Sequence, residues 1–154
     1  VSKQGYESGV FEVAKAENEQ VIVEALLTPI MPIITEREVI LQPIYFEFNK
    51  SNITAEGAAE LDKLVMVMNE YPNMVIFAKS HTDSRGSDKY NMNLSDRRAK
   101  STMQWLISKG ISADRLTAKG YGETQLVNKC ADGVQCSEAE HQLNRRSQFI
   151  ITAL

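Results

Sequence analysis

The feature that most constrains this fold is a short apolar segment followed by a polar turn and a long helical pattern. Residues 74–79 (MVIFAK) are nearly all apolar, which is typical of a strand covered on both faces. A turn follows at residues 84–87, and helical spacing of apolar residues continues until Gly110, which suits the position just after a helix. We therefore expect a strand–turn–helix unit whose turn lies at the carboxyl end of the strand, where ligands tend to bind.

Arg98 is the arginine of this helix that should face the sheet. At about 100° per residue, one stripe of the helix consists of Asn91, Leu94, Arg98, Thr102 and Trp105. Because Leu94 and Trp105 are expected to be buried, the guanidinium of Arg98 points inward and needs an anion. Asp83, at the strand end, is the nearest candidate. The pair is either an internal salt bridge or a ligand site, and its position at a strand end favours the ligand site.

The flanking segments complete an α/β domain. Residues 44–48 predict a first strand, and a helix begins at Thr54 and stops before Pro72. A third strand is expected at residues 115–119 and a final strand at residues 146–154. The fold class is therefore α/β, an α+β sandwich of βαβαβ type with helices packed on one side of a mixed sheet.

A short β-rich segment precedes this domain. Residues 10–13 and 20–26 read like strands, and residues 29–38 look like a linker. We expect residues 1–39 to be this segment and linker, possible last strands of a preceding β-sandwich module, and residues 40–154 to be the main domain. The longest apolar stretch is too interrupted to span a membrane, and there is no signal peptide, so the chain reads as part of something longer.

Composition and charge exclude several functions. The chain of 154 residues is 43% hydrophobic and 24% charged, with a net charge of −3 and a pI near 5.5. This balance argues against nucleic-acid and anionic-membrane binding. No Ser/His/Asp set, activated cysteine or persuasive carboxylate pair is present, so we expect no enzyme, and no cofactor is implied.

Four separated motifs carry a resemblance to a known family. They are YFEFNKSNIT at residues 45–54, HTDSRGSDKYNMNLSDRRA at residues 81–99, KGYGE at residues 119–123 and NRR at residues 144–146. Together they resemble the OmpA-like C-terminal domain, the peptidoglycan-associated module of Gram-negative envelopes. The resemblance implies non-covalent binding of peptidoglycan through the diaminopimelate of the stem peptide. It also implies a place at the periplasmic face of the outer membrane, with membrane contact only through an upstream region.

The resemblance assigns the two principal ligand contacts. It implies that the acid of the HTD motif, Asp83, takes the ammonium of diaminopimelate and that the arginine of the LSxxRA motif, Arg98, takes its carboxylate. The residue types suit a zwitterion, which needs one fixed anion and one planar, bidentate cation. Thr82, in the same motif, joins the predicted ligand-binding set. Ser80 stands where relatives commonly have glycine, which should change details of specificity and leave binding intact.

Four further residues have two interpretations each. Asn49 and Asn91 either assist ligand binding, as the resemblance implies, or serve as turn and cap residues. Arg145 and Arg85 either form a positive rim for carboxylates of the wall or hold structural contacts to acidic neighbours. We include all four among the candidate ligand-binding residues.

The two cysteines, Cys130 and Cys136, are expected to form a local disulfide in an oxidising compartment. So short a loop predicts a stabilisation of about 2 kcal/mol. A metal site with His141 and His81 is the alternative, but the spacing matches no usual zinc pattern, so no metal is predicted. His81 itself is expected to make a structural hydrogen bond.

Two functional classes remain. The first is a peptidoglycan-binding module that anchors the outer membrane or an envelope protein to the wall. The second is an interaction or oligomerisation scaffold of the same fold that does not bind the wall.

Overall fold

The computed structural model describes residues 32–154, and the compact unit within it runs from Ile33 to Leu154. The strands expected at residues 10–13 and 20–26 lie outside the described residues, and the division at residue 39 stays a prediction. The helices of the described part are too short or too polar to span a lipid bilayer.

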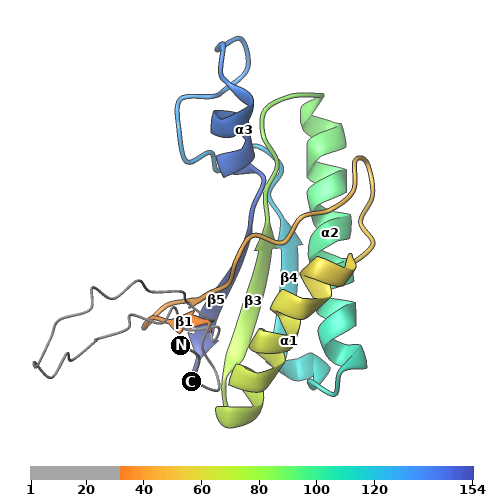
Figure 1. Cartoon of the computed structure of the whole chain (residues 1–154), viewed down its shortest axis with the longest axis vertical. Helices are drawn as coiled ribbons and strands as arrows, with labels where there is room; N and C mark the ends of the chain where they lie inside the picture. Colours follow the sequence, from red (N-terminus) through yellow and green to blue (C-terminus); the bar gives the residue numbers. More distant parts are fainter. Residues whose placement is uncertain (1–31) are drawn as a thin grey trace, which may run out of the picture. The chain divides into compact units, whose positions relative to one another are not determined.

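The described elements alternate between strands and helices (Figure 1). Their order is β1 (Ile33–Ile34), β2 (Val39–Ile40), α1 (Ala55–Glu70), β3 (Val75–Ser80), α2 (Asp88–Ser108), the 3-10 turn η1 (Ala113–Arg115), β4 (Leu116–Gly120), α3 (Glu138–Asn144) and β5 (Ser147–Ala153). β3 is the central strand of a mixed sheet, parallel to β4 and antiparallel to β5. The predicted α/β class and mixed sheet are therefore confirmed.

The core lies between one face of this sheet and the helices α1 and α2. Alternate residues of β3 are buried and the residues between them are only partly buried, so the prediction of a strand covered on both faces is wrong and one face is the buried one. The largest fully buried apolar side chains of the core are Leu61, Leu64, Met68, Met74, Ile76 and Leu106. Leu94 is buried as predicted, and Trp105 is partly buried against the core.

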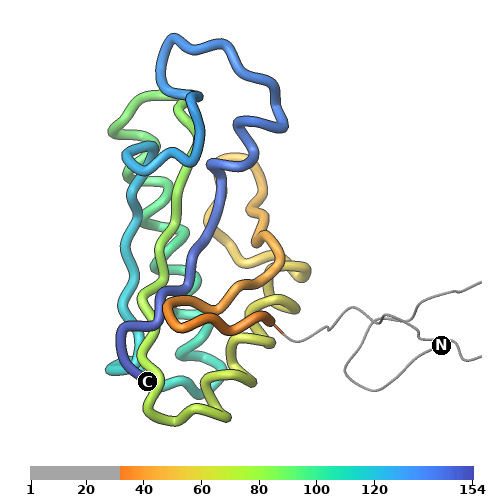
Figure 2. Tube along the Cα trace, turned by 90° about the vertical axis from the view of Figure 1, so that its left-hand side faces the viewer, coloured from red at the N-terminus to blue at the C-terminus, as the bar shows by residue number. Residues whose placement is uncertain are grey.

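Residues 44–48 do not form the predicted first strand. They run as an irregular segment, and the position beside β5 is taken instead by the short antiparallel hairpin β1–β2, through a bridge between Glu38 and Ile150 (Figure 2). The physical reason is Arg98 of α2, which donates hydrogen bonds to the backbone carbonyls of Glu47 and Lys50. These carbonyls therefore bond to a side chain and not to a neighbouring strand.

Two further elements differ from expectation. The expected linker contains the hairpin turn, in which the Thr35 hydroxyl oxygen accepts from the backbone N–H of Glu38 at 3.0 Å. α3 was not predicted, although its first turn has a capping box formed by Ser137 and Glu140. The predicted helix ends are confirmed at Thr54, which caps α1, and at Gly110, which follows α2 with a φ of +99°.

Gly120 allows α2 to approach β4 closely. A Cβ atom at this position would overlap the backbone of Ser95 and Asp96. Neither partner is the flexible end of a side chain, so the overlap can be relieved only by moving the helix away from the strand.

We predict that Gly120→Ala lowers the free energy of unfolding by about 1–3 kcal/mol or more, because overpacking against a fixed backbone forces α2 and β4 apart. Denaturant unfolding followed by circular dichroism measures the change. Thr117→Ala, at an exposed position of the same strand, is the control and should change stability little. Equal stability of Gly120→Ala and wild type would contradict this account of the helix–strand contact.

His81 is buried just beyond the end of β3, and only 2% of it is exposed. Its ring stacks on Tyr121 with 5.6 Å between centroids. Within the described part of the chain, neither ring nitrogen has a partner at full hydrogen-bond geometry, although the Gln148 side chain is close enough to raise the pKa of His81 somewhat. Burial, together with the positive charges of Arg146 and Lys79, lowers the pKa of His81 to about 4.

This depressed pKa should make stability fall on acidification. Between about pH 6.5 and pH 4, His81 is protonated in the unfolded chain but neutral in the folded protein. The free energy of unfolding therefore decreases as the pH falls through this range. We predict that His81→Phe, which keeps a ring on Tyr121, flattens the dependence of unfolding free energy on pH over that range. Titration of the His81 ring protons by NMR gives a direct check, and a midpoint near 6.5 would refute the prediction.

Candidate ligand-binding site

A cavity of about 580 Å³ lies at the carboxyl end of β3. Its walls come from the irregular segment at residues 44–49, the first turns of α2, α3 and the start of β5. All of the residues predicted to bind ligand line this one cavity: Asn49, Thr82, Asp83, Arg85, Asn91, Arg98 and Arg145. The structure therefore brings together residues from four separate stretches of the sequence.

Asp83 is the buried acid of the cavity, with 8% of its side chain exposed. Its Oδ2 accepts from Arg85 Nη2 at 2.8 Å and from Arg145 Nη1 at 2.6 Å, while Oδ1 accepts from the backbone N–H of Arg85 at 2.9 Å. Burial alone would raise the pKa of Asp83, but the hydrogen bonds from Arg85 and Arg145 outweigh it and hold the pKa below its usual value. The acid is therefore ionised at neutral pH.

Arg98 lines the same cavity but is not paired with Asp83, so an internal salt bridge between the two is wrong. Arg98 Nε donates to the backbone carbonyl of Lys50 at 2.9 Å, and Nη2 donates to that of Glu47 at 3.3 Å. Its guanidinium also lies 4.8 Å from the ring centroid of Phe46. Only 9% of Arg98 is exposed, and burial lowers its pKa. No carboxylate in residues 32–154 forms a salt bridge with it.

The two asparagines hold the backbone around the cavity. Asn49 has a φ of +57°, a left-handed conformation that asparagine tolerates, and its Oδ1 accepts from the Tyr90 hydroxyl at 2.7 Å. Asn91 is buried and its Nδ2 donates to the Asp83 carbonyl at 3.2 Å. Thr82 differs, because its buried Oγ1 has no hydrogen-bond partner in the described part of the chain.

Sequence reasoning missed Glu138, which completes the electrostatics of the site. Arg85 Nη1 donates to its Oε2 at 2.8 Å, and Arg145 Nη2 donates to its Oε1 at 2.5 Å. Glu138 begins α3, and the S-x-x-E pattern of Ser137 and Glu140 was the signal that could have located this helix and its acidic first turn.

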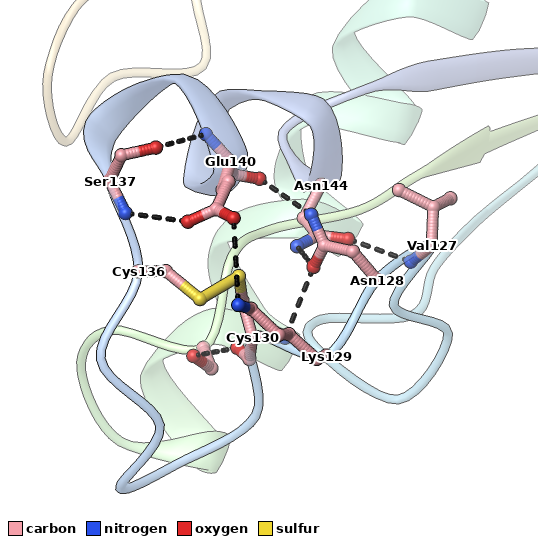
Figure 3. Close-up of a disulfide and its surroundings, with 9 residues drawn as sticks. Val127, Asn128, Lys129, Cys130, Cys136, Ser137, Glu140 and Asn144 are labelled. Carbon is pink, nitrogen blue, oxygen red and sulfur yellow. Dashed lines mark hydrogen bonds and ion pairs between the residues drawn. A yellow bond between two sulfur atoms is a disulfide. The ribbon is translucent and has the colours of Figure 1, made fainter.

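The predicted disulfide between Cys130 and Cys136 is present, and it fixes the loop that leads into α3 (Figure 3). The Cys130 carbonyl accepts from the hydroxyl of Ser84, directly after Asp83, at 2.5 Å. At the other end of the loop, Ser137 and Glu140 exchange the two hydrogen bonds of the capping box. The loop thus connects the HTD motif to the helix that carries Glu138.

The alternative of a metal site built on the two cysteines is wrong. The sulfur atoms of Cys130 and Cys136 are bonded to each other and offer no thiolate. Oxygen atoms of Asp88, Glu123 and Asp132 lie within 4.8 Å of one another. Burial, a hydrogen bond with Asp88 and the neighbouring carboxylates of Asp132 and Asp83 raise the pKa of Glu123 to about 7.

Comparison with known proteins places these features in a family. Residues 45–140 match the model of the OmpA family. An outer membrane protein A from Serratia marcescens is 38% identical over 100 residues, which are 62% of this chain and 28% of that protein. A peptidoglycan-associated lipoprotein from Buchnera aphidicola is 38% identical over 107 residues, 70% of this chain and 59% of that protein. The chain thus spans less than two thirds of either relative.

The fold has solved counterparts as well. The structure of the peptidoglycan-associated lipoprotein from Burkholderia pseudomallei superposes with a TM-score of 0.62 at 24% identity, covering 71% of this chain and 88% of that one. The similarity at this identity concerns the fold. Because the family model covers more than half of the sequence, the chain belongs to the OmpA family.

Proposed function

We propose that this domain binds peptidoglycan non-covalently, through the diaminopimelate of the stem peptide, and anchors an envelope protein to the cell wall. Family membership and a relative named for its association with peptidoglycan support the ligand class. The periplasmic face of the outer membrane is the corresponding location.

The observation that carries the proposal is a buried cation that pairs with no carboxylate in the described part of the chain. Arg98 is nine-tenths buried, and within residues 32–154 the partners of its guanidinium are two backbone carbonyls and an aromatic ring. A buried charge without a counter-charge is costly, so a ligand carboxylate at this position would lower the free energy. Asp83, which lines the same cavity, supplies the opposite charge for an ammonium. One cavity therefore offers both poles of a zwitterion.

The other five candidate residues also line this cavity. The unpartnered Thr82 hydroxyl can both donate and accept, so it can pair with either end of the amino-acid head. Arg145 and Arg85 lie at the side of the cavity where Asp83 lies, and both pair with this acid. Asn49 and Asn91 contribute by holding the loop and the HTD motif in place.

We predict that Arg98→Lys weakens binding to diaminopimelate-type sacculi by about tenfold or more, because lysine keeps the charge and loses the planar fork. Arg98→Ala and Asp83→Asn should abolish retention in a sacculus co-sedimentation assay. Arg97→Lys is the matched control, since Arg97 neighbours Arg98 and is exposed. Circular dichroism checks that each variant is folded. Equal retention of wild type and all variants would favour the scaffold function instead.

Discrimination between wall types tests the role of Arg98 separately. Lysine in the stem peptide lacks the terminal carboxylate of diaminopimelate, so Arg98 would stay unpaired at a cost of about 1–3 kcal/mol. We therefore expect lysine-type muropeptides to bind about tenfold more weakly, or worse, than diaminopimelate-type muropeptides in calorimetric titrations. The same affinity for both would show that Arg98 does not bind this carboxylate.

A further inference from the structure

The acid of the candidate site is already occupied by cations of this chain. Asp83 Oδ2 accepts from Arg85 and Arg145 at 2.8 Å and 2.6 Å. Both acceptor positions of Oδ2 are thus in use, so a ligand ammonium that pairs with this oxygen must displace at least one of these guanidiniums. The displacement would cost more if the departing arginine had no other carboxylate to contact.

Glu138 is a second carboxylate for both arginines. Each guanidinium uses one nitrogen for Asp83 and another for Glu138: Arg85 reaches Glu138 at 2.8 Å and Arg145 reaches it at 2.5 Å. The two acids and two arginines form a closed ring of ion pairs with no net charge. Either arginine can therefore release Asp83 and still keep a carboxylate partner.

We propose that Glu138 is a positioning residue for ligand binding, which holds Arg85 and Arg145 while the ligand's ammonium replaces them on Asp83. The inference rests on the proposed function. Arg145, released from Asp83 but still bound to Glu138, then has nitrogen atoms free for a second carboxylate of the ligand. The zwitterion enters by an exchange of ion pairs.

The exposure of the side chains in this ring of ion pairs agrees with a positioning role for Glu138. The side chain of Glu138 is 64% exposed and that of Arg145 is 31% exposed, whereas that of Asp83 is 8% exposed. The exchange thus takes place at the mouth of the cavity, where side chains can move into solvent. Because exposed ion pairs contribute little to stability, loss of the Glu138 charge should change affinity far more than it changes folding.

The backbone of Glu138 is also fixed independently of the ring. It lies in the first turn of α3, within the capping box formed by Ser137 and Glu140 and just after the loop closed by Cys130 and Cys136. The carboxylate of Glu138 is therefore held at the mouth of the cavity even when one arginine has moved.

The test compares Glu138→Gln, Glu138→Asp and wild type in calorimetric titrations with free meso-diaminopimelic acid and with a diaminopimelate-type muropeptide. We expect Glu138→Gln to raise the Kd about three- to tenfold, because the displaced arginine loses its second partner. Glu138→Asp should restore most of the affinity. Glu56→Gln is the control, since Glu56 is likewise a first-turn glutamate and is exposed. It should bind like wild type.

A double-mutant cycle separates positioning from a simple charge effect. In a background that carries both Arg85→Ala and Arg145→Ala, Glu138→Gln should no longer weaken binding. The same loss in that background, or wild-type affinity of Glu138→Gln in the native background, would overturn the inference while leaving the roles of Asp83 and Arg98 intact. No binding by the wild type would overturn the proposed function together with it.

Discussion

A buried guanidinium that finds no carboxylate partner among residues 32–154 determines the architecture around the cavity. Arg98 points inward because it lies on the apolar stripe of α2. Its guanidinium contacts the backbone carbonyls of Glu47 and Lys50 and the ring of Phe46. Carbonyl dipoles compensate a full charge only in part. The segment that supplies them gives up strand pairing to do so, and it becomes one wall of the cavity. The same contact therefore shapes the fold and leaves a cation that an anion would stabilise.

Arg98 and Asp83, the two charged residues proposed to bind the ligand, differ in how far their charges are already paired. Arg98 is short of an anion, so a ligand carboxylate meets a cation that has little to lose. Asp83 is fully engaged, and its low pKa expresses how well Arg85 and Arg145 satisfy it. A ligand with only an ammonium would have to break these ion pairs without gaining a second contact. The arrangement therefore favours ligands that carry both charges over simple amines.

The part of the structure that follows from local periodicity could be predicted. The strand–turn–helix unit and the inward direction of Arg98 are set by spacings within about thirty residues, and helical geometry determines them. Residues 44–48 show the limit, since their alternating apolar residues imitate a strand, yet Phe48 is 94% exposed. Their conformation depends on Arg98, 51 positions from Glu47 in the sequence. The partner of Asp83 across the cavity, Arg145, is 62 positions away, and only the fold reveals that pairing.

The disulfide has a consequence for one wall of the cavity. α3 has seven residues, too few to be stable as an isolated helix, and it depends on the loop that Cys130 and Cys136 close. With the cysteines reduced, the loop that links Ser84 to α3 would be less constrained, and so would the cavity wall that bears Glu138. The strands and long helices need no such help. We therefore expect reduction of the disulfide to loosen the cavity wall that bears Glu138 and to leave the sheet and the two long helices in place.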